Sequence, residues 1–534
     1  MFHQLVTPVA GSLFGSFLVA TIPIVVVLVL LGVLRRPAWQ ASSAGLIVGM
    51  GLATAIWQLP IDIALQSVAA GATFAAWPVM WIVVNALLLY NVSVASGRFS
   101  AFRDWMIQHL PNDRRIALIV IGFSFGCLLE GIAGFGAPIA ITSALLIALG
   151  FKAIDAVVFT LIFNTAPVAF GALGSPVTTL AAVTQLHDVE LGAMIGRQLP
   201  FIALLLPFYV MVVYGGFRAL RGIWPILLIS GGSFALMQFL SSNYIGYALT
   251  DVLSSLTSLI VTLAFVKIWR PQYDPHFALY PAGQTTPQHE PSAHAAWQGW
   301  LPWLILSVIV IAWVHFEINL IGQFKIEWPG LHNEVFITTY GKPYAAIWTF
   351  QPLATGTAIL VATMVTALFT RLSMRQLRDA LSGTLSQVRL PLLTTMLIVG
   401  LAYLMNYSGI AYTLGVGVAA VGFLFPLVSA FLGWLAVFLS GSDTSGNALF
   451  GNLQVVAAHQ LDLNPVLMAA TNASGGVMGK MVSPQNISTG TSTTAIKGRE
   501  GEVLARTFWH SILLTLLLGI LVMLQQYVFP GMIP

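Results

Sequence analysis

The sequence predicts an all-α polytopic membrane protein with about 12–14 transmembrane helices. Of its 534 residues, 57% are hydrophobic and 7% are charged, whereas soluble domains carry about 25% charged residues. Long apolar runs recur along the whole chain, and many approach the roughly 20 residues that a membrane-spanning helix needs. These runs are continuous rather than alternating, so they predict helices and not the strands of a membrane barrel.

The first apolar run, residues 17–34, predicts a retained transmembrane helix. Arg35 and Arg36 follow this run rather than precede it, which is the wrong order for a cleaved signal peptide. By the positive-inside rule these arginines belong in the cytoplasm, which places the N-terminus outside. Other Lys and Arg residues also fall in short loops, so the net charge of +4 indicates membrane topology and not nucleic-acid binding.

A polar, proline-rich stretch at 271–299 separates two hydrophobic regions. We expect an extramembrane loop there, between membrane regions 1–270 and 300–534. Its "HEPSAH" segment does not fit a zinc-binding helix, because His289 and His294 are five residues apart and Pro291 interrupts them. No metal or other cofactor is therefore expected. A second polar stretch, 319–346, predicts an extramembrane loop or a short interfacial element.

The two membrane regions share a series of motifs in the same order. "NTAPVAFGALGSP" begins at Asn164 and "NASGGVMGKMVSP" at Asn472. Shared composition alone could produce such a match, since membrane helices are rich in Gly and Pro. Two further pairs favour a true repeat: "LEGIAGFGAP" with "SGSDTSGNAL", and "YNVSVASG" with "MNYSGIAY". We therefore predict two structural repeats, inverted as in many transporters, with re-entrant hairpins and broken helices.

These Gly-, Pro- and hydroxyl-rich segments predict an anion-binding cavity inside the membrane. Backbone that is not helical is tolerated there only where protein buries it or where it lines a wet cavity. The amide ends of interrupted helices carry about half a positive charge, which favours a carboxylate. Hydroxyl and amide side chains in the same segments can bind a carboxylate or a small alcohol: Ser175, Ser445, Asn447, Asn472, Ser483 and Asn486.

Three ionisable residues interrupt these apolar surroundings, at a cost of about 2.5–3.5 kcal/mol each at mid-bilayer. Lys480 is either a partner of an anionic substrate or a structural ion-pair partner of Asp443 or Glu130. Glu130 is either a proton carrier or a carboxylate that caps the glycine-rich loop after it. The same alternatives hold for Asp443, where capping is favoured. Phe135 can pack against a short alkyl group or simply against other helices.

Five long motifs closely resemble those of the bacterial L-lactate permease family: "EGIAGFGAPIAIT", "NTAPVAFGALGSP", "GRQLPF", "FLSGSDTSGNALFGNLQ" and "GGVMGKMVSPQNI". The resemblance extends from about residue 10 to the C-terminus. It implies a secondary transporter of the bacterial inner membrane that imports lactate, and commonly glycolate, with protons. It also implies that the segments around the breaks line the substrate site. Gly134, Gly136, Asn164, Thr165 and Gln485 join the candidate residues on that basis.

The charge of the substrate independently favours a coupled cation. A lactate anion that enters a negative cell interior is opposed by roughly 2.3 kcal/mol per 100 mV. One proton per anion makes transport electroneutral. The simplest way to bind that proton is a protonatable acid near the site, either Glu130 or Asp443. A sodium-coupled carboxylate transporter of similar architecture is the alternative. An enzyme is not expected, because the chain has no HExxH, GxSxG or nucleotide-binding motif.

Overall fold

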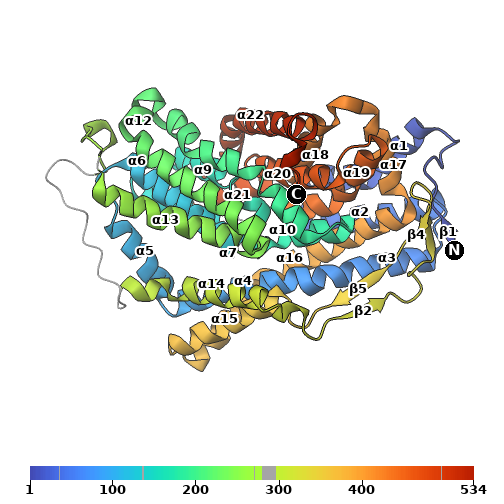
Figure 1. Cartoon of the computed structure of the whole chain (residues 1–534), viewed down its shortest axis with the longest axis horizontal. Coiled ribbons are helices and arrows are strands. Elements are labelled where there is room, and N and C mark those ends of the chain that lie inside the picture. The colour runs from blue at the N-terminus through green and yellow to red at the C-terminus, as the bar shows by residue number, and fades with distance from the viewer. Residues whose placement is uncertain (35, 135–136, 270, 280–295, 493, 495) are drawn as a thin grey trace.

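The computed structural model describes residues 1–34, 36–134, 137–269, 271–279, 296–492, 494 and 496–534. The described chain is almost entirely helical, which confirms the predicted all-α class (Figure 1). Before the proline-rich stretch the helices are α1 (Leu13–Leu28), α2 (Ala38–Ala55), α3 (Ile61–Phe74), α4 (Trp81–Ala95), α5 (Arg98–Gln108), α6 (Arg114–Ala117), α7 (Gly126–Ile132), α8 (Ala137–Ala148), α9 (Ala153–Phe163), α10 (Gly171–Thr184), α11 (Asp188–Ile195), α12 (Leu199–Leu240) and α13 (Thr250–Ile268). After it they are α14 (Leu301–His315), α15 (Thr355–Phe369), α16 (Met374–Ser408), α17 (Ile410–Val418), α18 (Phe425–Ser440), α19 (Asp443–Gln460), α20 (Pro465–Lys480), α21 (Pro484–Ser492) and α22 (Glu500–Tyr527).

Nine helical segments in the described chain are long and apolar enough to cross a membrane, or ten if the bent pair α9 and α10 counts as one. The sequence predicts about 12–14 spans from the same length rule. Part of the difference lies in the segment Asp188–Ile245, which has 58 residues and counts once. Its backbone leaves helical geometry at Gly215 and Gly216, so the segment contains more than one helix long enough to span. The polytopic architecture is confirmed.

Five short strands gather at one end of the molecule, beside the N-terminus (Figure 1). They are β1 (Phe2–His3), β2 (Phe324–Glu327), β3 (Val335–Ile337), β4 (Lys342–Pro343) and β5 (Ile347–Phe350). β3 pairs in parallel with β1 and antiparallel with β4, while β2 pairs antiparallel with β5. The polar stretch 319–346 therefore contains three of these short strands, joined by turns. The arginine-bearing helices α5 and α6 lie at the opposite end (Figure 1).

All four Gly- and hydroxyl-rich segments coincide with helix breaks. Two of them separate α7 from α8 and α18 from α19, and two more separate α9 from α10 and α20 from α21. The chain bends by 64° between α9 and α10. There the backbone passes through the left-handed region at Ala172, Leu173 and Gly174. Each membrane region thus supplies two of the four breaks. Whether the regions are related by inversion stays a prediction.

Helices from the two membrane regions pack directly against each other at the centre of the molecule. α10 packs on α19, and α11 packs on α20. Within the second region α18 and α20 approach closely, because Gly433, Gly475 and Gly479 leave no side chain between the two backbones. Small residues at helix contacts are typical of membrane bundles. This packing brings the four helix breaks together.

Candidate functional site

The helix breaks surround a small cavity with a mostly buried lining, which we call the central cavity. Its volume is about 50 Å³. It is lined by residues of α7, of the break before α10, of the tip between α18 and α19, and of the junction between α20 and α21: Glu130, Gly134, Val168, Gly171, Ala172, Ser175, Pro176, Gly441, Ser442, Asp443, Thr444, Lys480, Gln485 and Asn486. Both membrane regions therefore contribute to one site.

An ion pair between Lys480 and Glu130 joins the two regions across this cavity. The Lys480 ammonium contacts Oε1 of Glu130, and Asn164 Nδ2 donates to Oε2 at 3.0 Å. Lys480 is only 5% exposed and Glu130 only 3%. Gly171 makes room for this carboxylate, since a Cβ there would lie 3.1 Å from Oε1. The Glu130 carboxylate thus holds the lysine in the described chain, and whether it also caps the loop that follows α7 stays open, because Phe135 and Gly136 of that loop lie outside the described residues.

Asp443 sits in the first turn of α19, where Ser442 and not Asp443 is the N-cap. Its Oδ2 accepts a hydrogen bond from Asn447 Nδ2 at 3.4 Å, and its Oδ1 has no partner among the described residues. The same Asn447 amide donates to the Pro176 carbonyl at 3.2 Å. Asn472 Nδ2 in turn donates to Asn447 Oδ1 at 2.9 Å. These two amides therefore hold α10, α19 and α20 together beside the cavity.

The first turns of α19 and α21 both face the central cavity. Ser442, Asp443 and Thr444 line it from α19, and Gln485 and Asn486 line it from α21. The N-terminal amides of a helix carry partial positive charge and are a common binding site for anions. Together with the Lys480 ammonium, they make the cavity suited to a small carboxylate.

The structure places the predicted site residues in three groups. Those that line the cavity are Glu130, Gly134, Ser175, Asp443, Lys480, Gln485 and Asn486. Those directly behind it are Asn164, Asn447, Asn472 and Ser483. Thr165 and Ser445 do not line it: the Thr165 hydroxyl donates to the Ile162 carbonyl of its own turn at 2.8 Å, and the Ser445 amide donates to the Ser442 side chain at 3.4 Å. Phe135 and Gly136 lie outside the described residues.

Several residues in or near the cavity are not among the sequence candidates. Gly171, Gly441 and Thr444 line it and lie within the interrupted motifs, so their position in those motifs is a usable signal. Asp251 does not line the cavity but packs against Gly131, next to Glu130; it lies in "YALTDVLSSLTSLIVT", a helical run with no glycine break. The only signal for it was a single acid within an apolar helix.

The chain matches the L-lactate permease family over residues 16–529. It belongs to that family. It is 40% identical to the glycolate permease GlcA of Escherichia coli (strain K12), over 98% of each chain. Identity to the L-lactate permease of Bacillus subtilis (strain 168) is 38% over 99% of each chain, and identity to that of Escherichia coli (strain K12) is 37% over 98% of each. The family resemblance that the motifs indicate is confirmed, and the chain is a multi-span membrane permease.

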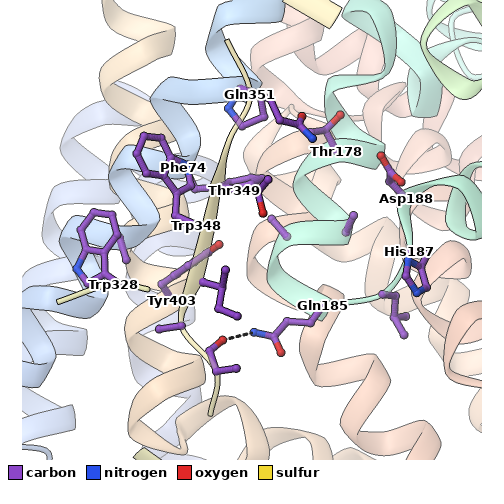
Figure 2. Close-up of a pocket in the computed structure, with 18 of the residues that line it drawn as sticks. Phe74, Thr178, Gln185, His187, Asp188, Trp328, Trp348, Thr349, Gln351 and Tyr403 are labelled. Carbon is purple, nitrogen blue, oxygen red and sulfur yellow. Dashed lines mark hydrogen bonds between the residues drawn. The ribbon is translucent and has the colours of Figure 1, made fainter. Parts of the chain in front are cut away.

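Two larger cavities flank the central one in this permease. The first, of about 480 Å³, lies beside the β-structure and is called the strand-side cavity. Figure 2 shows Thr178, Gln185 and His187 on one side of it, with Trp348 and Tyr403 on the other. Thr178 lies one helical turn beyond Ser175 of the central cavity.

The second, the arginine-side cavity, has a volume of about 620 Å³ and is lined by Arg36 and the first residues of α22. Gln485 lines both this cavity and the central one. The span Leu13–Leu31 separates the N-terminal end of the chain from Arg36, so the two flanking cavities lie toward opposite faces.

Proposed function

We propose that the protein imports L-lactate together with protons across the bacterial cytoplasmic membrane, and that it also accepts D-lactate and glycolate. Membership of the L-lactate permease family supports this proposal, as do relatives that are named L-lactate and glycolate permeases. The flanking cavities offer the site a path to each face. Arg36 and the arginines of α5 and α6 favour placing the strands outside the cell.

The proposal of proton coupling rests on the buried ion pair between Lys480 and Glu130. Among the described residues that line the cavity, two carboxylates, Glu130 and Asp443, share the lining with a single ammonium, that of Lys480. A substrate carboxylate would add a further negative charge, and burying an unpaired charge costs several kcal/mol. A proton on Glu130 removes that obstacle, because it neutralises the acid and releases Lys480 to the substrate. Binding of the anion and of the proton thereby favour each other.

The polar groups around Lys480 suit a short hydroxy acid. The hydroxyls of Ser175 and Thr444 and the amide of Asn486 line the same cavity and can pair with a 2-hydroxyl group. A volume of about 50 Å³ corresponds to only a few water molecules, since one water needs roughly 10–15 Å³. The site therefore favours substrates of two or three carbons over longer acids.

Uptake into proteoliposomes tests this function and separates it from the sodium-coupled alternative. With the outside acidic and no sodium present, labelled L-lactate should accumulate, since each unit of pH gradient contributes about 1.4 kcal/mol, or tenfold accumulation. A protonophore should abolish the accumulation. Accumulation that requires a sodium gradient and ignores the pH gradient would instead identify sodium as the coupling ion.

A further inference from the structure

Asp251 is a buried acid that does not line the central cavity and has no part in the transport steps proposed above. It lies in the first turn of α13 and is 1% exposed. Neither of its carboxylate oxygens has a hydrogen-bond partner among the described residues. A carboxylate buried in this way is unfavourable when ionised and much less so when it carries a proton. The position therefore suits an acid that binds and releases protons.

Asp251 packs directly against the residue that follows Glu130. A Cβ added at Gly131 would lie 2.6 Å from the Asp251 Cβ, so only a glycine permits this approach of α7 to α13. Electrostatic interactions connect the Asp251 carboxylate with Glu130 and Lys480 and with the thiol of Cys127 on α7. In the described chain, α10, α12 and the π-helical segment Leu118–Phe125 add no charged group to this contact.

The chain just before Asp251 contacts the lining of the strand-side cavity through a tyrosine. Four residues before Asp251, the hydroxyl of Tyr247 donates to Asp188 Oδ2 at 2.9 Å and contacts Thr178 Oγ1 at 3.2 Å. Both Asp188 and Thr178 line that cavity, and Figure 2 shows them near its Gln351 end. Gly174 and Gly192 leave space for the Tyr247 ring between α10 and α11. Asp251 thus lies between Gly131, next to the buried ion pair, and a tyrosine that contacts the lining of the strand-side cavity.

The geometry points to Asp251 as a second proton-binding residue, which takes a proton from the strand-side cavity and passes it to Glu130. This inference rests on the proposed proton-coupled transport. The proton leaves an Asp251 oxygen and binds the Glu130 carboxylate, directly or through one water. The ion pair with Lys480 then breaks, and the ammonium pairs with the substrate carboxylate. Asp251 is reprotonated from the strand-side cavity, so the step conserves charge and protons.

Proteoliposomes with a pH-sensitive dye inside test this assignment with the variant Asp251→Asn, which keeps the shape of the side chain. Lactate-driven proton influx should fall at least tenfold. Exchange of labelled for unlabelled lactate at equal pH should stay within about twofold of the wild type, because the central cavity is intact. The matched control is Ser255→Ala, one turn along α13. The Ser255 hydroxyl is also buried and has no hydrogen-bond partner in the described chain. Its removal should leave both readouts unchanged.

Two results would overturn the assignment: an Asp251→Asn variant that moves protons with lactate as the wild type does, or one that loses exchange together with proton influx. A wild-type protein that never carries protons would instead refute the proposed function itself. The wild type also allows a test that needs no variant. A carbodiimide, which attacks protonated carboxyl groups, should modify Asp251 at acidic pH and less at alkaline pH. Peptide mapping that finds Glu130 modified and Asp251 untouched at every pH would contradict the proposal.

Discussion

Lys480 provides the only ammonium group among the described residues that line the central cavity, and it contacts the Glu130 carboxylate. The lysine reaches Glu130 across 350 positions of sequence, so this pair depends on the tertiary fold. The sequence does identify both residues as costly charges in apolar helices. It cannot distinguish Glu130 from Asp443 as the partner, because that choice depends on how α7, α19 and α20 pack.

Replacing Lys480 with alanine should weaken lactate binding about 10- to 150-fold. A hydrogen bond to a charged group contributes about 1.5–3 kcal/mol, and each 1.4 kcal/mol is about tenfold in affinity. Calorimetry on the purified protein measures this change. Lys497→Ala, which removes an exposed lysine, is the matched control, and equal affinity in the two variants would remove Lys480 from the binding site.

Replacing Glu130 with glutamine should abolish accumulation of lactate driven by a pH gradient, because the amide cannot take up the proton. Binding of lactate should persist, since Lys480 is no longer held by a carboxylate. Uptake and calorimetry on the same preparation check both statements, with the exposed Glu190→Gln as the control. If the Glu130→Gln variant still concentrates lactate as the wild type does, the coupled proton is carried elsewhere.

At the scale of elements, the helix breaks are the best-predicted part of the site. Clusters of glycine, proline and hydroxyl residues favour interruption of a membrane helix, and the broken backbone must then be buried or line a cavity, so the four interruptions can be located from sequence. Their mutual contact cannot, and neither can the short strands, since β2 and β5 consist of only four residues each. Asp251 escapes sequence analysis because its role depends on the close approach of α13 to Gly131.

The hairpin tip at Gly441 gives a test of this element. Its φ of 72° lies in the left-handed region, and a Cβ would come within 2.9 Å of the Ser483 and Gln485 side chains. Gly441→Ala should therefore destabilise the protein by about 1–2 kcal/mol and slow lactate uptake, because the tip must shift against α21. Thermal unfolding and uptake measure the two effects.

Gly501→Ala is the matched control for that experiment, since an added Cβ there meets open space within α22. It should be neutral or stabilising, by up to about 1 kcal/mol, because alanine favours helix over glycine. A Gly441→Ala variant as stable and as active as Gly501→Ala would show that the tip does not need this conformation.

At the scale of the whole molecule, two larger cavities toward opposite faces flank one small central site. This arrangement allows access to alternate between the faces, as in transporters built from broken helices. The single cysteine, Cys127, is buried, so introduced cysteines can report accessibility. An impermeant maleimide should label Gln185→Cys only from outside and Ser488→Cys only from inside. Labelling of both from the same face would contradict the proposed orientation.

Proton uptake by the purified protein as lactate binds tests the central claim most directly. If Lys480 passes from Glu130 to the substrate, Glu130 becomes protonated, so adding lactate to a weakly buffered solution of the protein should raise the pH. The pH rise should follow lactate occupancy and disappear in Glu130→Gln. Saturable lactate binding by the wild type with no change in bound protons would contradict the mechanism.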